Sequence, residues 1–132
     1  GDFAKEYADS LYESVGHTAV ITDRDTVIAV SGGPEKEFLN KPIGSLIERC
    51  MEERRSVLVP RAGAERPIKG SLFGDEDEET KFSAFVVSPI ISAGDPIGAV
   101  VICSKEPNAE MGELELKLAE TAAGFLAKQM EQ

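Results

Sequence analysis

The stretch FSAFVVSPIISAGDPIGAVVICS, residues 82–104, decides the fold. It contains two long apolar runs, 82–91 and 97–103, joined by the turn-forming residues 92–96. Both alternating sets of side chains in the second run are apolar, so the predicted hairpin is covered on both faces. Pro89 has no N–H to donate inside a strand, which predicts a bulge or bend there. The hairpin is therefore expected at the centre of a buried sheet.

Two amphipathic segments lie at the ends of the chain. Residues 2–15 predict a helix that Asp2 can cap and Gly16 can end, with apolar side chains on about half of its circumference. Residues 113–130 predict a longer helix whose apolar arc covers roughly 200°. That arc is wider than one contact with a sheet requires, which predicts a second buried surface on this helix.

The middle of the chain alternates short elements and polar loops. The elements expected there are strands at 17–22 and 26–31, a helix at 44–55, a short strand at 57–59 and another strand at 68–73. No linker or internal repeat divides the sequence. Residues 1–132 are therefore expected to form a single domain.

Composition excludes several functional classes. With 24 acidic and 14 basic residues the net charge is −10, which opposes binding of this chain to the phosphates of DNA. Two cysteines cannot build a disulfide framework, and no apolar stretch reaches 18 residues, so a cytoplasmic location without membrane contact is expected. Glycine at position 1 in place of methionine predicts a fragment of a longer protein.

The order of the predicted elements and the SPII…GDPIGAVV hairpin resemble a GAF domain. Further segments resemble the carboxy-terminal domain of the stage V sporulation protein T family, over essentially the whole chain and most weakly at 60–81. These segments are GDFAKEYA at 1–8, GH at 16–17, DRD at 23–25, IAVSG at 28–32, LNK at 39–41 and TAAGFLA at 121–127.

This resemblance implies a regulatory domain of a sporulation-specific transcription factor. In the family, an amino-terminal swapped-hairpin domain of the AbrB type binds DNA, and the GAF domain pairs subunits and is presumed to sense a small molecule. The implied fold is α+β, with an antiparallel sheet of about six strands. Both terminal helices cover one face of the sheet, and short pocket-forming helices and loops cover the other. DNA contact is expected only through the amino-terminal domain, which this sequence does not contain.

The terminal helices are the predicted subunit interface, which would form a homodimer or a higher homo-oligomer. The interface candidates are Phe3, Tyr7, Leu11, Leu114, Leu118, Phe125 and Leu126. The alternative is that both helices belong entirely to the core of one subunit.

A locally basic segment suggests a ligand pocket for a small effector, with no cofactor. Its cations are Arg54, Arg55, Arg61, Arg66 and Lys69, and guanidinium groups favour carboxylate or phosphate. The pocket candidates are Ser31, Arg54, Arg55, Arg66, Ser83 and Phe85. Two alternatives stay open: the cations pair with Glu52, Glu53 and Glu65, or a purely structural oligomerisation module has its pocket filled by Leu58, Phe82 and Phe85.

Nothing in the sequence predicts an enzyme. Some GAF domains reduce methionine sulfoxide with loop cysteines, but Cys50 and Cys103 lie in apolar runs and read as core residues. No catalytic or metal-binding motif is present in the sequence, and His17, the only histidine, is interpreted as structural. The acidic run 75–79 lacks the spacing of a calcium loop, so no metal site is predicted.

Overall fold

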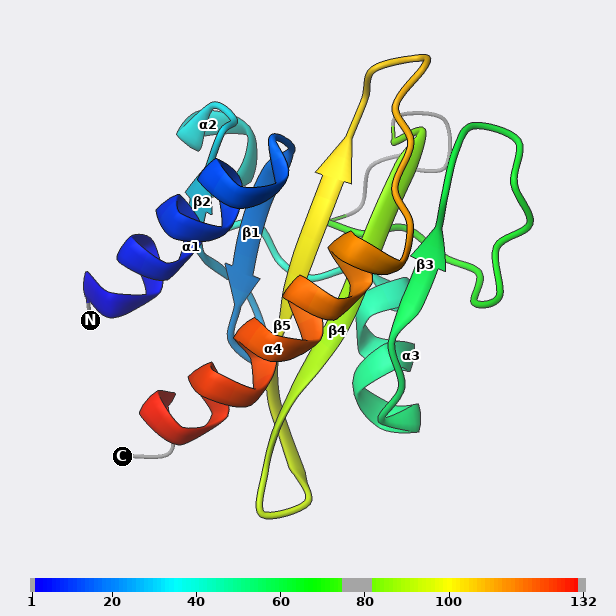
Figure 1. Cartoon of the computed structure of the whole chain (residues 1–132). Helices are drawn as coiled ribbons and strands as arrows, with labels where there is room; N and C mark the ends of the chain where they lie inside the picture. The colour runs from blue at the N-terminus through cyan, green and yellow to red at the C-terminus, as the bar shows by residue number, and fades with distance from the viewer. Residues whose placement is uncertain (1, 75–81, 131–132) are drawn as a thin grey trace.

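The computed structural model describes residues 2–74 and 82–130, which form an α+β domain with helices on both faces of a sheet (Figure 1). The elements in chain order are α1 (Asp2–Val15), β1 (Thr18–Thr22), β2 (Val27–Ser31), α2 (Glu35–Phe38), α3 (Ser45–Glu53), β3 (Val57–Val59), β4 (Ala84–Ser92), β5 (Asp95–Ser104) and α4 (Glu113–Met130). No helix within the described ranges is both long and apolar enough to span a bilayer.

The described strands make one antiparallel sheet of five strands in the order β2-β1-β5-β4-β3, one fewer than the expected six. The prediction of a strand at 68–73 is wrong, because this segment forms hydrogen bonds with the start of α3 instead. The Gly44 N–H donates to the Leu72 carbonyl oxygen, and the Leu46 N–H donates to that of Ser71. A Cβ on Gly44 would lie 2.2 Å from the Ser71 oxygen, so only glycine allows this approach.

The central hairpin is confirmed, with a shorter turn than predicted. Its strands pair from Ala84 opposite Ser104 to Ser92 opposite Asp95, which leaves a two-residue turn. Both turn residues, Ala93 and Gly94, have positive φ angles of 52° and 81°, as a type I′ turn requires. That turn matches the twist of the strands, so they continue further than composition suggested.

Pro89 is accommodated without the bulge predicted at its own position. It pairs with Ala99, and the register shifts between Ile90 and Ile91 instead. Strand β3 pairs with residues 85–87 of β4, so within residues 2–74 and 82–130 Pro89 has a neighbouring strand on one side only. A proline, which has no backbone N–H, is tolerated at such an edge position because no second strand requires that donor.

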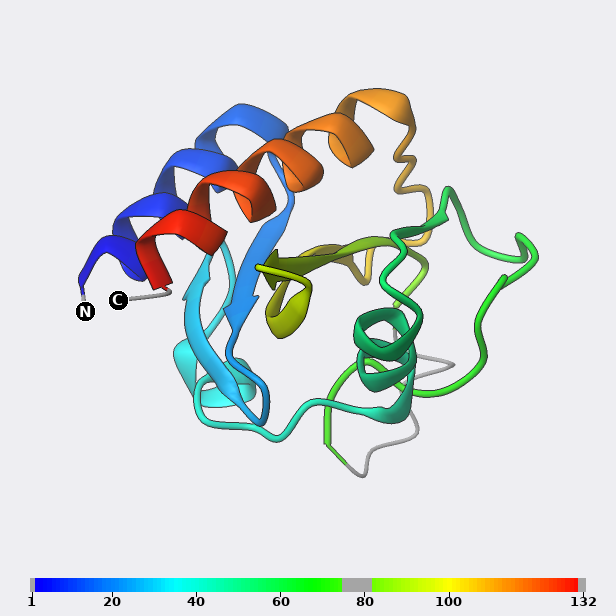
Figure 2. The same cartoon turned by 90° about the horizontal axis from the view of Figure 1, so that it is seen from below.

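Side chains alternate between the two faces of the sheet. Ala19, Val86 and Ile102 pack against α1 and α4, whereas Val20, Phe85 and Val101 pack on the side of α3. Figure 2 shows α1 and α4 side by side over the first face and α3 on the opposite one. The small residues that let the terminal helices approach the sheet are Ala4, Ala8, Ala119, Ala122 and Ala123.

Local signals explain where the terminal helices start and stop. Gly16 has a positive φ of 73°, and its N–H donates to the Tyr12 carbonyl oxygen, so it ends α1 as predicted. Before α4, the Gly112 N–H donates to the Glu115 carboxylate at 2.7 Å, which satisfies a donor at the start of the helix. The predicted cap by Asp2 involves its side chain, which lies outside the described part of the structure, where only the backbone of Asp2 is given.

Candidate association and ligand sites

The outward faces of α1 and α4 carry an apolar surface made by Phe3, Tyr7, Leu114, Leu118 and Phe125, here called the helix-pair surface. The Tyr7 and Phe125 rings stack across the two helices, with centroids 4.9 Å apart and an interplanar angle of 28°. Phe125 is nevertheless 46% exposed and Leu114 63% exposed. Tyr7 and Leu118 are half-buried beside them. Large apolar side chains therefore face solvent along both helices.

Two of the predicted interface residues lie elsewhere. Leu11 and Leu126 are buried against the sheet, because their positions on the helices point inward with the alanines. They belong to the core of this chain. The other five predicted interface residues remain on the outside.

A cavity of about 570 Å³ lies where the loop after β3 faces the end of the β4–β5 hairpin; we call it the basic cavity. Its charged lining is Arg61, Glu65, Arg66, Lys69 and Lys105. Four cations and one carboxylate make it basic in a chain whose net charge is −10. The field inside therefore favours an anion.

Contacts to the sheet hold the lining of the basic cavity in place. The Arg66 guanidinium lies 5.1 Å from the centre of the Phe85 ring, and its Nη2 donates to the Phe82 carbonyl oxygen at 3.4 Å. The Ser83 hydroxyl donates to the Glu106 carbonyl oxygen at 2.5 Å. These bonds tie the loop and the hairpin end together, so the cavity is a product of the fold.

The structure brings together three of the six predicted pocket residues. Arg66 and Ser83 line the basic cavity, and Phe85 lies beneath the Arg66 guanidinium. Lys105 was missed by the sequence reasoning. It directly follows β5, opposite Ser83 at the same end of the hairpin, and that register was the available signal.

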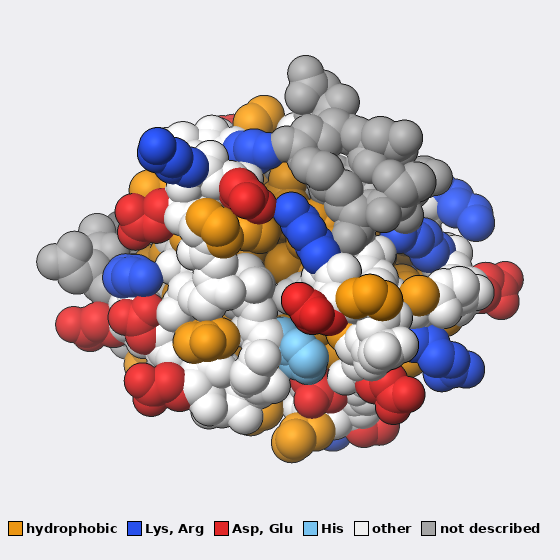
Figure 3. Space-filling view, turned by 90° about the horizontal axis from the view of Figure 1, so that it is seen from above, with side chains coloured by type: hydrophobic (Ala, Val, Ile, Leu, Met, Phe, Trp, Pro, Cys, Tyr) orange, Lys and Arg blue, Asp and Glu red, His pale blue; other side chains and the backbone are white. Residues whose placement is uncertain are grey.

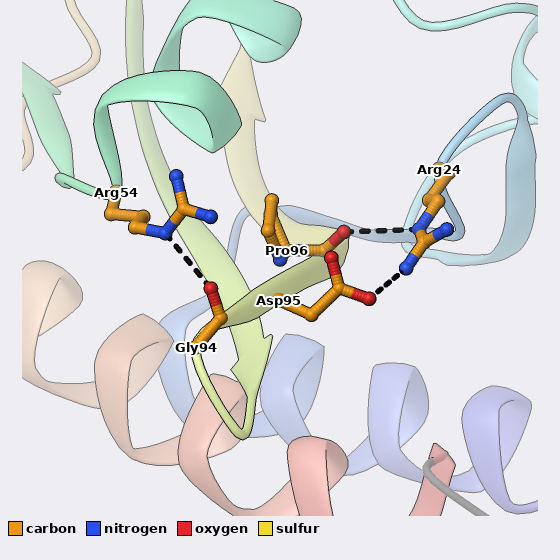
Figure 4. Close-up of polar contacts among 5 residues, drawn as sticks. All are labelled: Arg24, Arg54, Gly94, Asp95 and Pro96. Carbon is orange, nitrogen blue, oxygen red and sulfur yellow. Dashed lines mark hydrogen bonds and ion pairs between the residues drawn. The ribbon is translucent and has the colours of Figure 1, made fainter.

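Arg54 and Arg55 lie at the other end of the hairpin. Arg54 ends α3 in a left-handed conformation, and its Nε donates to the Gly94 carbonyl oxygen at 3.0 Å (Figure 4). The Arg55 Nε lies 3.0 Å from the Glu53 carboxylate, the surface pairing that was one of the alternatives for these cations. Neither residue contributes to the basic cavity.

Figure 4 also shows a second arginine on this hairpin turn. Arg24, from the β1–β2 turn, forms an ion pair with Asp95 and donates from Nε to the Pro96 carbonyl oxygen at 3.1 Å. Both arginines thus hold the turn from opposite sides, which is a structural use of their charge.

The predicted pocket residue Ser31 lies under α1, away from the basic cavity. Its hydroxyl bonds to the Asp9 carboxylate, and this bond, with a second one from Lys5, lowers the pKa of Asp9. Ser31 is buried, so its role is to join β2 to α1.

A second cavity of about 300 Å³ adjoins the first; we call it the glycine cavity. Gly32 and Gly33 form one wall, with His17 and Tyr12 beside them. A Cβ on Gly32 would lie 2.2 Å from the Tyr12 ring, so glycine is required for this wall. Figure 3 looks onto this end of the molecule, where basic and acidic side chains surround a hollow with an apolar floor beside the histidine.

The interior on the α3 side is filled by aromatic rings. The Phe73 ring contacts those of Phe38 and Phe82, with centroids 5.6 Å and 6.0 Å apart, and Phe85 is fully buried nearby. Leu58 packs on the other face of the sheet. Phe82 and Phe85 therefore fill the centre of this side, as one alternative required, while both cavities lie at its rim.

The family model described as "Stage V sporulation protein T C-terminal, transcription factor" matches residues 1–131. The chain belongs to this family. Stage V sporulation protein T of Bacillus subtilis (strain 168) is 54% identical over 132 residues, which are 100% of this chain and 69% of that protein. Membership of this family of sporulation transcription factors supports a regulatory role.

Solved structures show that this sporulation-factor domain has the GAF fold. The GAF domain of a phosphoenolpyruvate-protein phosphotransferase from Coxiella burnetii matches with a TM-score of 0.73 and 20% identity, over 97% of this chain and 80% of that one. A type II free methionine-R-sulfoxide reductase from Thermoplasma acidophilum matches with a TM-score of 0.68 and 16% identity, over 96% and 92%. At these identities the likeness concerns the fold alone.

Neither thiol of this sporulation-factor domain resembles a reactive cysteine. Cys50 and Cys103 are both buried and free, and burial raises the pKa of each thiol to about 12. A thiol in that state carries almost no thiolate near neutral pH. Among the described residues, no three His, Cys, Asp or Glu side chains are grouped to hold a metal ion. The acidic run 75–79 lies outside those residues.

Proposed function

We propose that this chain is the non-catalytic regulatory domain of a cytoplasmic sporulation transcription factor and that it associates subunits through the helix-pair surface. The observation that carries this proposal is the exposure of Leu114 and Phe125 beside the stacked Tyr7 ring. DNA would be bound by another domain, because the charge of −10 disfavours phosphate contacts here.

The spacing of the helix-pair surface suits a second helix pair. Phe3 and Tyr7 are four residues apart, as are Leu114 and Leu118, and Phe125 follows seven residues after Leu118. Side chains at these intervals lie on one stripe of a helix. Two copies related by a two-fold axis can pack such stripes into a four-helix bundle, in which the same surface meets itself.

Analytical ultracentrifugation of the wild type and of Phe125→Asp tests the association. We expect the wild type to dimerise at tens of micromolar. The variant should dissociate at least about tenfold more readily, because it places a charge in an apolar contact. Lys36→Glu on α2 is the control for added negative charge. A monomeric wild type, or equal dissociation of both variants, would contradict the proposal.

A second function, sensing of a small anion, is favoured by the basic cavity. Its arginines and lysines provide the donors that phosphate and carboxylate groups require, on a frame held by Phe85 and Ser83. Binding there would bias the arrangement of the loop after β3 against the sheet. Such a bias regulates only if the ligand prefers one arrangement to another.

Calorimetry with inorganic phosphate and with small carboxylates tests this role. Arg61→Ala should lower the affinity about three- to tenfold, because it removes one charge from the cavity wall. Arg55→Ala removes the same charge outside the cavity and should leave binding unchanged. Absence of any binding heat would favour the alternative of a purely structural association module, which the packed aromatic interior also supports.

A further inference from the structure

We propose that the basic cavity and the glycine cavity are two halves of one site for an aryl or similarly flat organic phosphate, and that the Glu37 carboxylate competes with the ligand for Lys105. The inference rests on the proposed anion-binding role and adds the ligand's shape and an internal competitor. It concerns the two cavities at the end of the molecule that Figure 3 faces.

The two cavities share walls. Phe82 and Lys105 line both of them. Ser83, in the first cavity, and Ser104, in the second, are joined by a bond from the Ser83 N–H to the Ser104 carbonyl oxygen at 2.9 Å. A ligand that passes over Phe82 beside Lys105 can therefore reach from one cavity into the other.

The two halves differ in chemistry. The basic half has arginine and lysine side chains that suit a phosphate group. The glycine half has the aromatic residues Tyr12, Phe38 and Phe82 in its lining, with Glu37 and Glu106 as its carboxylates. Gly32 and Gly33 add a wall without side chains. Flat aromatic groups favour such surfaces, so the body of the ligand fits there while its phosphate stays in the basic half.

Lys105 stands at the junction and already has an anionic partner. Its ammonium lies 3.0 Å from the Glu37 carboxylate and 5.4 Å from the centre of the Phe82 ring. Both side chains of the ion pair are about half exposed, 42% for Lys105 and 52% for Glu37. Exposed ion pairs are weak, so a phosphate can take the ammonium from Glu37. The Glu37 carboxylate thus occupies the place at Lys105 that the ligand's phosphate would take.

Replacement of Glu37 by the ligand's phosphate at Lys105 would affect two helices. Glu37 and Phe38 belong to α2, a helix of only four residues, and Tyr12 belongs to α1. A ligand in the glycine half would touch α1, which also carries Phe3 and Tyr7 of the helix-pair surface. The site therefore adjoins the element through which subunits are proposed to associate.

The test uses 2-naphthyl phosphate and inorganic phosphate as probes, with titrations followed by ¹⁵N NMR and calorimetry. We expect 2-naphthyl phosphate to shift amide signals of Gly32 and Gly33 as well as those of Arg66 and Ser83. Inorganic phosphate should shift only the second pair. Glu37→Gln should raise the affinity for 2-naphthyl phosphate about three- to tenfold, and Lys105→Met should lower it about tenfold.

Glu35→Gln and Lys36→Met are the matched controls, since they make the same charge changes on α2 outside both cavities. Both should stay within about twofold of the wild type. If both phosphates bind in the basic half but Glu37→Gln has no effect and the glycine signals do not move, this inference is wrong while anion binding stands. If neither phosphate binds to any of these proteins, the anion-sensing role is wrong as well.

Discussion

The two faces of the sheet are closed in different ways. On one face, the regular helices α1 and α4 lie close to the strands because alanines line their inner sides. On the other face, short helices, loops and a cluster of phenylalanine rings cover the strands. The helices on the first face carry the exposed apolar helix-pair surface, whereas the second face has the two cavities at its rim.

This difference separates the two proposed roles. Regular helices hold their outward side chains in a fixed stripe, which suits a contact between rigid surfaces. Loops leave irregular gaps at the rim of a packed core, and polar side chains line them. We therefore expect substitutions on the two faces to affect different properties. Five predictions follow from the packing of the two faces.

The largest expected effect concerns the thiols on the α3 side. Because burial raises the pKa of Cys50 and Cys103 to about 12, their alkylation by iodoacetamide at pH 8 should be about a thousandfold slower than in unfolded protein. The fraction of modified protein over time, by mass spectrometry, is the measurement. Cys103 is part of the lining of the glycine cavity, so its rapid labelling in folded protein would show that this cavity opens to the buried thiol.

The same thiols give a sign for the pH dependence of stability. Their folded pKa is above the unfolded one, so the unfolded chain loses these protons first as pH rises. The free energy of unfolding should therefore fall between about pH 9 and pH 12. A Cys50→Ala, Cys103→Ala double variant should show a weaker decline over this range.

Next in size is removal of a ring from the packed α3 side. Phe85→Ala should lower the free energy of unfolding by about 3–5 kcal/mol, because this fully buried ring is replaced by a void. Urea denaturation followed by circular dichroism measures it. Phe85→Leu should lower the free energy of unfolding by less. An equal decrease for both variants would contradict the explanation that the void causes the loss.

On the other face, two leucines of the same helix should differ sharply. Leu126→Ala should destabilise the monomer by about 2–4 kcal/mol, because Leu126 is fully buried. Leu114→Ala, at a site that is 63% exposed, should change it by less than about 0.5 kcal/mol. If Leu114→Ala weakens self-association while monomer stability is unchanged, the division between inner and outer sides of α4 is confirmed.

The smallest effect is a gain. The Thr22 hydroxyl is buried without a hydrogen-bond partner among the described residues. Thr22→Val keeps the shape and removes that polar atom, so unfolding should become harder by about 1 kcal/mol. Thr18→Val is the contrast, because the Thr18 hydroxyl donates to the Gly32 carbonyl oxygen at 2.9 Å. Loss of this hydrogen bond should lower the free energy of unfolding. A loss of stability in Thr22→Val would point to a bound water.

Periodicity was enough to predict the terminal helices and the central hairpin, because burial of one helix stripe and of two strand faces leaves a local pattern. It failed at 68–73, where Gly44 lets the segment bond to α3 in place of a sixth strand. It also overestimated the length of the turn between β4 and β5, because composition does not show that Ala93 has a positive φ.

The candidate sites were less predictable. The locally basic segment holds five cations within 16 residues, yet they separate in the structure. Arg54 contacts the hairpin turn and Arg55 pairs with Glu53, while Arg61, Arg66 and Lys69 line the basic cavity. Closeness along the chain says little about closeness in space once a strand, β3, intervenes. Lys105 joins the cavity only because β5 ends opposite the start of β4.

The sequence by itself determined the family, the terminal helices, the buried hairpin and the burial of both cysteines, because these follow from local pattern and from identity to relatives. Only the tertiary structure decided which apolar residues of α1 and α4 face outward and which cations share a cavity. Those outcomes depend on register and helix rotation, which arise when distant segments pack, so Leu126 is core and Phe125 is surface although they are neighbours in the chain.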